Sequence, residues 1–184
     1  MTPIPRASGP LLSRTNWQMA PGERAALEGL LATVKPPLAI EIGTAQGGSL
    51  ERIATHGAEV HTFDFEAQVD EPAFPNVTFH DGDNHVLLAG LLDDFERAGR
   101  NVDFVLIDAD HSTAGVRQDL EDVLTSSAVR ETFIVMHQFR ARDRSLRAAF
   151  GTGAWRVLAP ARSLKRRGRE RVAPALRRRR ERGS

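Results

Sequence analysis

The sequence predicts an α/β fold in which a doubly wound, mostly parallel sheet is covered by helices on both faces. Strand-like and helix-like stretches alternate through residues 38–136, as in sheets built from strand–helix–strand units. The fourth of these strand-like stretches, residues 102–107, is nearly continuously apolar at its end, as is typical of parallel strands buried on both faces. The first of them ends in a glycine-rich turn that opens a helix. At 184 residues and 41% hydrophobic content, the chain is long enough for one domain with a core.

The first helix is predicted at residues 21–34, where four apolar side chains recur at helical spacing after Pro21. A Pro-Pro pair at 36–37 ends this helix, and the apolar run 38–42 is the first predicted strand. After the glycine-rich turn, residues 49–55 are compatible with a second helix.

The next strand is predicted at residues 59–64, which alternate apolar and polar side chains and end in an acid. A loop at 72–76 precedes a short strand at 77–80. Residues 84–97 then place four apolar side chains on one helical face. The sequence therefore repeats the strand–helix unit.

The fourth strand is predicted at residues 102–107, and apolar positions between 116 and 124 mark the helix that follows it. Residues 132–136 form the fifth strand, and 155–158 could form one more. The sequence has room for only one convincing strand after the fifth.

The chain is predicted to divide into a loose, proline-rich arm at residues 1–20, a domain at 21–160 and an arginine-rich tail at 161–184. The tail carries ten Arg and one Lys against two Glu, or +9, so the net charge of +1 leaves −8 on the rest of the chain.

Three interpretations of the tail remain open. It could bind nucleic acid or another polyanion through phosphate contacts, although it has no aromatic side chains to stack on bases. It could be a solvated extension. We slightly favour the third, a shift of reading frame near residues 138–140.

The composition excludes several classes of protein. There is no cysteine, which rules out disulfides and thiolate metal sites. No apolar run approaches the roughly 20 residues of a membrane span. We expect a cytoplasmic protein that does not enter a membrane.

The turn at residues 41–49 reads acid-x-Gly-x-x-x-Gly, from Glu41 through Gly43 to Gly47. A dinucleotide fingerprint requires Gly-x-Gly-x-x-Gly, which disfavours an NAD-linked oxidoreductase. The turn resembles that of class I S-adenosylmethionine-dependent methyltransferases. The resemblance implies a Rossmann-like methyltransferase fold, which usually ends in two antiparallel edge strands, so this chain is expected to lack part of its C-terminal antiparallel edge. It also implies that Glu41, Gly43 and Gly47 lie at the methionine end of the cofactor. The start of the following helix would favour the carboxylate of that cofactor.

Two further acids follow strands. Asp64 ends the second strand, 21 residues after Gly43, and the resemblance implies that it accepts hydrogen bonds from the ribose hydroxyls, with Glu66 as a nearby substitute. A solvated aspartate at a strand end is the alternative. Asp83 follows the third strand, and the family pattern implies an acceptor for the adenine amino group there. A helix N-cap explains Asp83 equally well.

The fourth strand ends in Asp-Ala-Asp-His-Ser at residues 108–112. This stretch resembles a subgroup of small-molecule and sugar O-methyltransferases, methyltransferase family 24, with relatives of cephalosporin hydroxylase. The resemblance implies cofactor or Mg²⁺ contact for Asp108 and a general-base role for His111, so both are candidate catalytic residues. Capping and solvation of the next helix is the alternative interpretation.

The chain departs from that subgroup at the end of the fifth strand. Relatives complete their metal site there with an acid, whereas this chain has Met136, His137 and Gln138. A neutral amide is a weaker ligand for a cation that prefers carboxylate oxygen. Mg²⁺ is therefore doubtful as a second cofactor, and no metal ligand is predicted. His137 could act as a base, bind substrate or be a buried, hydrogen-bonded histidine.

These observations predict a methyltransferase that uses S-adenosylmethionine and transfers a methyl group to a hydroxyl of a small molecule, such as a sugar or secondary metabolite. The partner would be that small-molecule acceptor. Two alternatives remain: a catalytically impaired or truncated cofactor-binding protein, and a nucleic-acid-binding methyltransferase that uses the tail. The acceptor's identity and the oligomeric state are not predicted.

Overall fold

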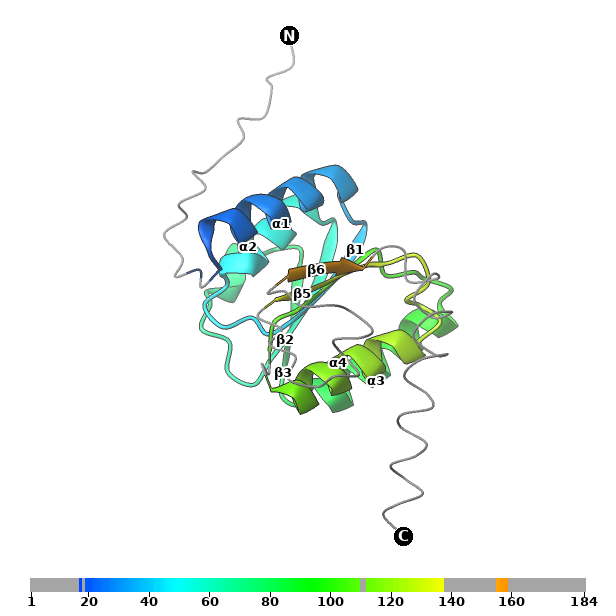
Figure 1. The fold of residues 1–184 in the computed structure, drawn as a ribbon. Helices are drawn as coiled ribbons and strands as arrows, with labels where there is room; N and C mark the ends of the chain where they lie inside the picture. The colour runs from blue at the N-terminus through cyan, green and yellow to red at the C-terminus, as the bar shows by residue number, and fades with distance from the viewer. Residues whose placement is uncertain (1–16, 18, 110–111, 138–154, 159–184) are drawn as a thin grey trace.

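A computed structural model describes residues 17, 19–109, 112–137 and 155–158 of the chain (Figure 1). Along the chain the elements are α1 (Pro21–Val34), β1 (Leu38–Ile42), α2 (Gly48–His56), β2 (Glu59–Asp64), the 3-10 turn η1 (Glu71–Ala73), β3 (Val77–Asp81), α3 (Asn84–Arg97), β4 (Phe104–Ile107), α4 (Thr113–Thr125), β5 (Phe133–His137) and β6 (Trp155–Leu158).

The six strands form one sheet in the order β3-β2-β1-β4-β5-β6. Neighbouring strands from β3 to β5 are parallel, and β6 pairs antiparallel with β5. The predicted doubly wound, mostly parallel α/β fold is therefore confirmed. β6 supplies an antiparallel edge, and the described residues contain no second antiparallel strand beyond it.

Helices cover both faces of the sheet, with α1 and α2 on one side and α3 and α4 on the other (Figure 1). Side chains of β1 alternate between the two faces, as a strand requires. Leu38, Ile40 and Ile42 pack in the core beneath α3 and α4, whereas Ala39 packs with Leu27 of α1 in the core on the other face.

The predicted bounds of α1, β1, β2, α3 and β6 match the structure, and those of α2, β3, β4 and β5 differ from it by one or two residues. The fourth strand begins at Phe104 rather than at residue 102. Val102 is buried, but its N–H donates to the carbonyl of Ala128, in the connection between α4 and β5. Burial without a ladder hydrogen bond explains why its apolar character suggested a longer strand.

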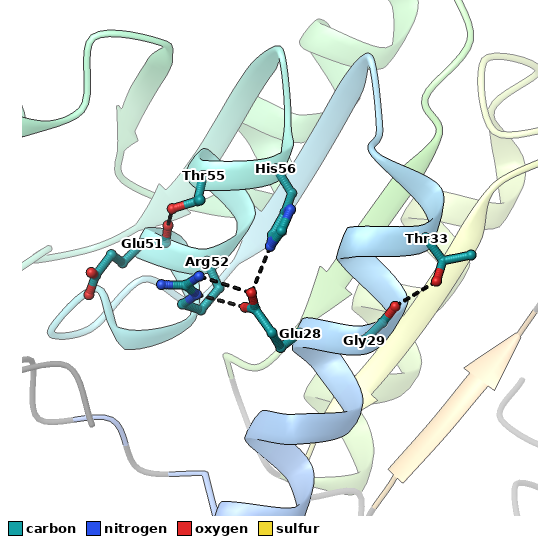
Figure 2. A network of polar contacts seen from close by, with 7 residues as sticks. All are labelled: Glu28, Gly29, Thr33, Glu51, Arg52, Thr55 and His56. Carbon is teal, nitrogen blue, oxygen red and sulfur yellow. Dashed lines mark hydrogen bonds and ion pairs between the residues drawn. The ribbon is translucent and has the colours of Figure 1, made fainter. Parts of the chain in front are cut away.

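An ionic cluster joins the two helices on the first face (Figure 2). Glu28 of α1 accepts hydrogen bonds from Nε and Nη2 of Arg52 at 2.7 and 2.9 Å, and His56 Nε2 lies 2.8 Å from the same carboxylate. The hydrogen bond from Arg52 is the main reason that the pKa of Glu28 is lowered. The contact fixes α2, which starts at the glycine-rich turn, relative to α1.

The packed core extends to residues before α1. Trp17 and Met19 are 7% and 2% exposed and belong to the core with α1 and α2. The boundary at residue 20 stays a prediction, and these two side chains pack onto the domain. Within the described part of the chain, no helix is long and apolar enough to cross a membrane.

Candidate functional site

A cavity of about 540 Å³ opens at the carboxyl ends of the parallel strands. The strand order reverses between β1 and β4, so the connections that follow these two strands lead to opposite faces. This is where ligands bind in open α/β sheets. The cavity is lined by residues from six parts of the chain: Trp17 and Met19; Gly43, Thr44, Ala45, Gln46, Gly48 and Ser49; Phe63, Asp64 and Phe65; Asp83, Asn84 and His85; Asp108 and Ala109; and Asp119.

The turn after β1 has a backbone that requires glycine. Gly43 has φ +96°, and a Cβ there would lie 2.5 Å from the carbonyl oxygen of Asp108. Gly47 is the N-cap of α2 with φ +76°, and a Cβ there would lie 2.6 Å from Cγ1 of Val69. Side chains are disfavoured at such φ values and contact distances. Both predicted glycines therefore shape the turn, and Gly43 sets the close approach of the β1 and β4 ends.

Glu41 lies behind the cavity wall. It is fully buried and accepts hydrogen bonds from Ser49 Oγ at 2.6 Å and Thr62 Oγ1 at 2.8 Å. Burial raises its pKa to about 8 despite these two donors. Ser49 lines the cavity and Glu41 does not. Glu41 can therefore act on a ligand only through Ser49, and its assignment to the cofactor site stays a prediction in this indirect form.

Asp64 ties the end of β2 to the glycine-rich turn and also lines the cavity. Its Oδ2 accepts hydrogen bonds from the backbone N–H groups of Thr44 and Ala45, both at 2.8 Å, and its Oδ1 accepts from Glu66 N–H at 2.9 Å. A carboxylate has about four acceptor positions. One position therefore remains for a ligand donor. Glu66 is not among the lining residues.

Asp83 is the N-cap of α3, where its side chain accepts from the N–H of His85 at 3.0 Å. It also lines the cavity, so the capping interpretation and the adenine interpretation are compatible. Beside it, Asn84 donates to Oδ1 of the buried Asp119 at 2.7 Å. His85 Nδ1 lies 2.7 Å from Asp122. These contacts fix α3 against α4 at this end of the cavity.

Asp108 follows β4 and is held by a histidine of β5. Nδ1 of His137 lies 2.8 Å from Asp108 Oδ1, and its Nε2 lies 3.2 Å from Glu23 of α1. Burial alone would lower the pKa of His137, but the hydrogen bonds and charges of Asp108 and Glu23 outweigh it and raise that pKa. Of the three roles considered for His137, the described contacts correspond to the buried, hydrogen-bonded histidine.

Several predicted residues lie outside the described part of the chain: Asp110 and His111 after β4, Gln138 after β5, and the arginine-rich tail. The N-cap of α4 is Ser112, which accepts from Gly115 N–H at 3.0 Å. Among the described residues, no group of three or more acidic or histidine side chains is arranged to hold a metal ion.

Sequence reasoning missed Phe65, Gln46, Asp119 and the cavity role of Trp17. Phe65 directly follows Asp64 and is 72% exposed at the cavity. An aromatic residue beside a predicted ligand-binding acid was a usable signal. The placement of Trp17 could not be read, because it depends on tertiary packing of an aperiodic segment.

The sequence pattern of a methyltransferase domain family, family 24, matches residues 40–139, more than half of the chain. The chain belongs to this methyltransferase family. No curated protein matches it. The matched region of this methyltransferase domain contains the glycine-rich turn, Asp64, Asp83 and Asp108.

The chain is also similar to several solved structures. A proposed O-methyltransferase from Klebsiella pneumoniae has 20% identity and a TM-score of 0.50, over 82% of this chain and 67% of that protein. The O-methyltransferase TomG from Streptomyces achromogenes, involved in tomaymycin synthesis and solved with S-adenosylmethionine, has 18% identity and a TM-score of 0.48, over 64% of this chain. The match to this chain covers 56% of the length of TomG. The methyltransferase MycE of the mycinamycin pathway, solved with Mg and S-adenosylhomocysteine, has 19% identity and a TM-score of 0.46, over 62% of this chain and 31% of MycE.

Proposed function

We propose that the domain binds S-adenosylmethionine in the 540 Å³ cavity and catalyses transfer of its methyl group to a hydroxyl oxygen of a small molecule. One observation supports this most directly. The glycine-rich turn that opens α2 and the carboxylate of Asp64 are hydrogen-bonded to each other and line the same cavity.

The residues around the cavity fit the three parts of this cofactor. Gly48 and Ser49 at the N-terminus of α2 would face its amino-acid end, where the helix dipole favours a carboxylate. Asp64 would accept from the ribose, and Phe65 offers an exposed ring to the adenine, with Asp83 as acceptor for its amino group. The cavity volume also falls within the usual range of about 300–1,000 Å³ for small-molecule sites.

Bound S-adenosylmethionine would supply an electrophilic methyl group on a sulfonium. The chain would contribute mainly by positioning, because the methyl carbon and the acceptor oxygen must meet in line. Asp108 lies at the end of β4 within the cavity lining, and His137 restrains its carboxylate. His111 remains the proposed general base for the hydroxyl proton. A sugar or secondary metabolite remains the proposed acceptor class.

The described residues do not fit a magnesium ion. Mg²⁺ requires near-octahedral oxygen ligands, including one or two carboxylates and several waters. One oxygen of Asp108 is hydrogen-bonded to His137, and the described part of the chain has no group of three suitable ligands. We therefore propose no metal-dependent step.

Isothermal titration calorimetry with S-adenosylhomocysteine tests the proposal directly. The wild-type protein should bind this product, and Asp64→Asn should weaken binding by about tenfold to a hundredfold, since a hydrogen bond to a charged group contributes roughly 1.5–3 kcal/mol. Asp93→Asn, on the exposed side of α3 and outside the lining, is the matched control and should bind as wild type. Absence of binding at millimolar ligand would refute the proposed function.

A further inference from the structure

We propose that Trp17 and Gln46 bind the zwitterionic amino-acid end of the cofactor. The Trp17 indole N–H would donate to the α-carboxylate, and the Gln46 carboxamide oxygen would accept from the α-ammonium. This inference rests on the proposed function and assigns a ligand contact to Trp17, which the family match does not include.

Two residues that line the cavity carry buried polar atoms with opposite hydrogen-bonding requirements. Nε1 of Trp17 and Oε1 of Gln46 are both enclosed, and neither has a hydrogen-bond partner. Both residues line the cavity. Buried polar groups are nearly always hydrogen-bonded, and an unsatisfied one costs about 1–3 kcal/mol. A ligand that offers an acceptor to the indole and a donor to the carboxamide would remove both costs.

Both residues lie next to the N-terminus of α2, Trp17 by packing and Gln46 by its position in the turn. A Cβ on Gly48 would lie 2.6 Å from Cβ and Cγ of Trp17, so the indole packs directly on the first residue of this helix. Gln46 lies two residues earlier, in the turn. The positive end of the α2 dipole favours an anion at this position. An α-amino acid carries an anionic acceptor and a cationic donor on one carbon, which matches this arrangement.

Trp17 is held in place without a ligand. Arg24 of α1 donates from Nε to the carbonyl of Met19 at 2.7 Å and from Nη2 to the carbonyl of Trp17. Its guanidinium carbon also lies 5.1 Å from the centre of the Trp17 ring, in a cation–π contact. Because the indole is positioned in advance, ligand binding would not have to order this segment.

The test compares S-adenosylhomocysteine with 5′-methylthioadenosine, which has the same adenosyl thioether but no amino-acid group. Trp17→Phe removes the indole N–H and keeps an aromatic ring, and Gln46→Met removes the carboxamide at similar length. Each variant should weaken S-adenosylhomocysteine binding about tenfold or more. Binding of 5′-methylthioadenosine should stay within about twofold of wild type.

A third ligand separates the two contacts. Decarboxylated S-adenosylhomocysteine keeps the ammonium, so its binding should be weakened by Gln46→Met and not by Trp17→Phe. Leu30→Met, which packs against the same apolar cluster as Trp17 and does not line the cavity, is the control and should leave all three affinities unchanged. Thermal unfolding of each variant establishes that it is folded.

Equal losses for S-adenosylhomocysteine and 5′-methylthioadenosine in both variants would overturn the proposal, since a general packing effect does not distinguish these ligands. Unchanged S-adenosylhomocysteine binding in both variants would also overturn it and would leave the proposed function intact. Failure of the proposed function is recognised separately, because wild-type protein would then bind none of the three ligands.

Discussion

Replacing Glu41 by glutamine should remove a large part of the pH dependence of stability between pH 5 and pH 8. The Glu41 carboxyl is fully buried, and burial raises its pKa from 4.5 to about 8. The folded state therefore keeps a proton that the unfolded state has released. The stabilisation from this proton is fully present below pH 4.5 and is lost as the pH rises through 8. With a slope of about 1.4 kcal/mol per pH unit, the loss amounts to roughly 3–5 kcal/mol.

Urea unfolding of wild type and Glu41→Gln at pH 5, 6, 7 and 8 measures this effect. The glutamine side chain can still accept from one of the hydroxyls of Ser49 and Thr62 and donate to the other. It therefore serves as a neutral, nearly isosteric comparison. The free energy of unfolding of wild type, relative to the variant, should fall by about 1.4 kcal/mol per pH unit. If the two curves stay parallel across this range, the argument that Glu41 is protonated in the folded protein is refuted.

Two further substitutions test the turn and the helix pair. Gly43→Ala should cost about 2–4 kcal/mol of stability in urea unfolding, because its Cβ would lie 2.5 Å from a carbonyl oxygen at φ +96°. Gly90→Ala on α3 meets nothing within 4 Å and should instead stabilise by about 0.5–1 kcal/mol; similar losses for both would contradict the steric argument. Glu28→Gln should cost about 1 kcal/mol at pH 7, since its ion pairs are partly exposed. The lowered pKa of Glu28 means that this cost should disappear as the pH falls through that pKa, and a cost that persists in acid would show that charge is not its origin.

Much of the fold could be predicted from the sequence, because strong local signals mark where its helices and strands begin and end. The predicted limits of α1 coincide with the observed ones, since a proline opens this helix and a Pro-Pro pair follows it. The limits of α3 also coincide, with Asp83 as its N-cap. Val102 is buried but is not paired in the sheet, and there the apolar pattern misplaced the start of a strand. Hydrophobicity reports burial and does not report which hydrogen bonds a residue makes.

The candidate site could be predicted from the sequence only in part. The acids at strand ends could be located, because parallel strands bring their carboxyl ends to one edge of the sheet. The hydrogen-bond partners of these acids could not be located in this way. His137 meets Asp108 across 29 residues of sequence and Glu23 across 114. No local pattern specifies such pairs, and the same holds for the packing of Trp17 on Gly48.

The charge state of Glu41 bears on how the cavity treats an anionic ligand. This carboxyl is hydrogen-bonded to Ser49, the second residue of α2. An ionised carboxylate at this position would itself interact with the positive end of the helix dipole and oppose a second anion. With a pKa near 8, Glu41 is neutral at pH 7 and leaves that end of α2 available. The buried acid thus helps form the turn and, under the proposed function, would leave the carboxylate of the ligand as the anion at the helix N-terminus.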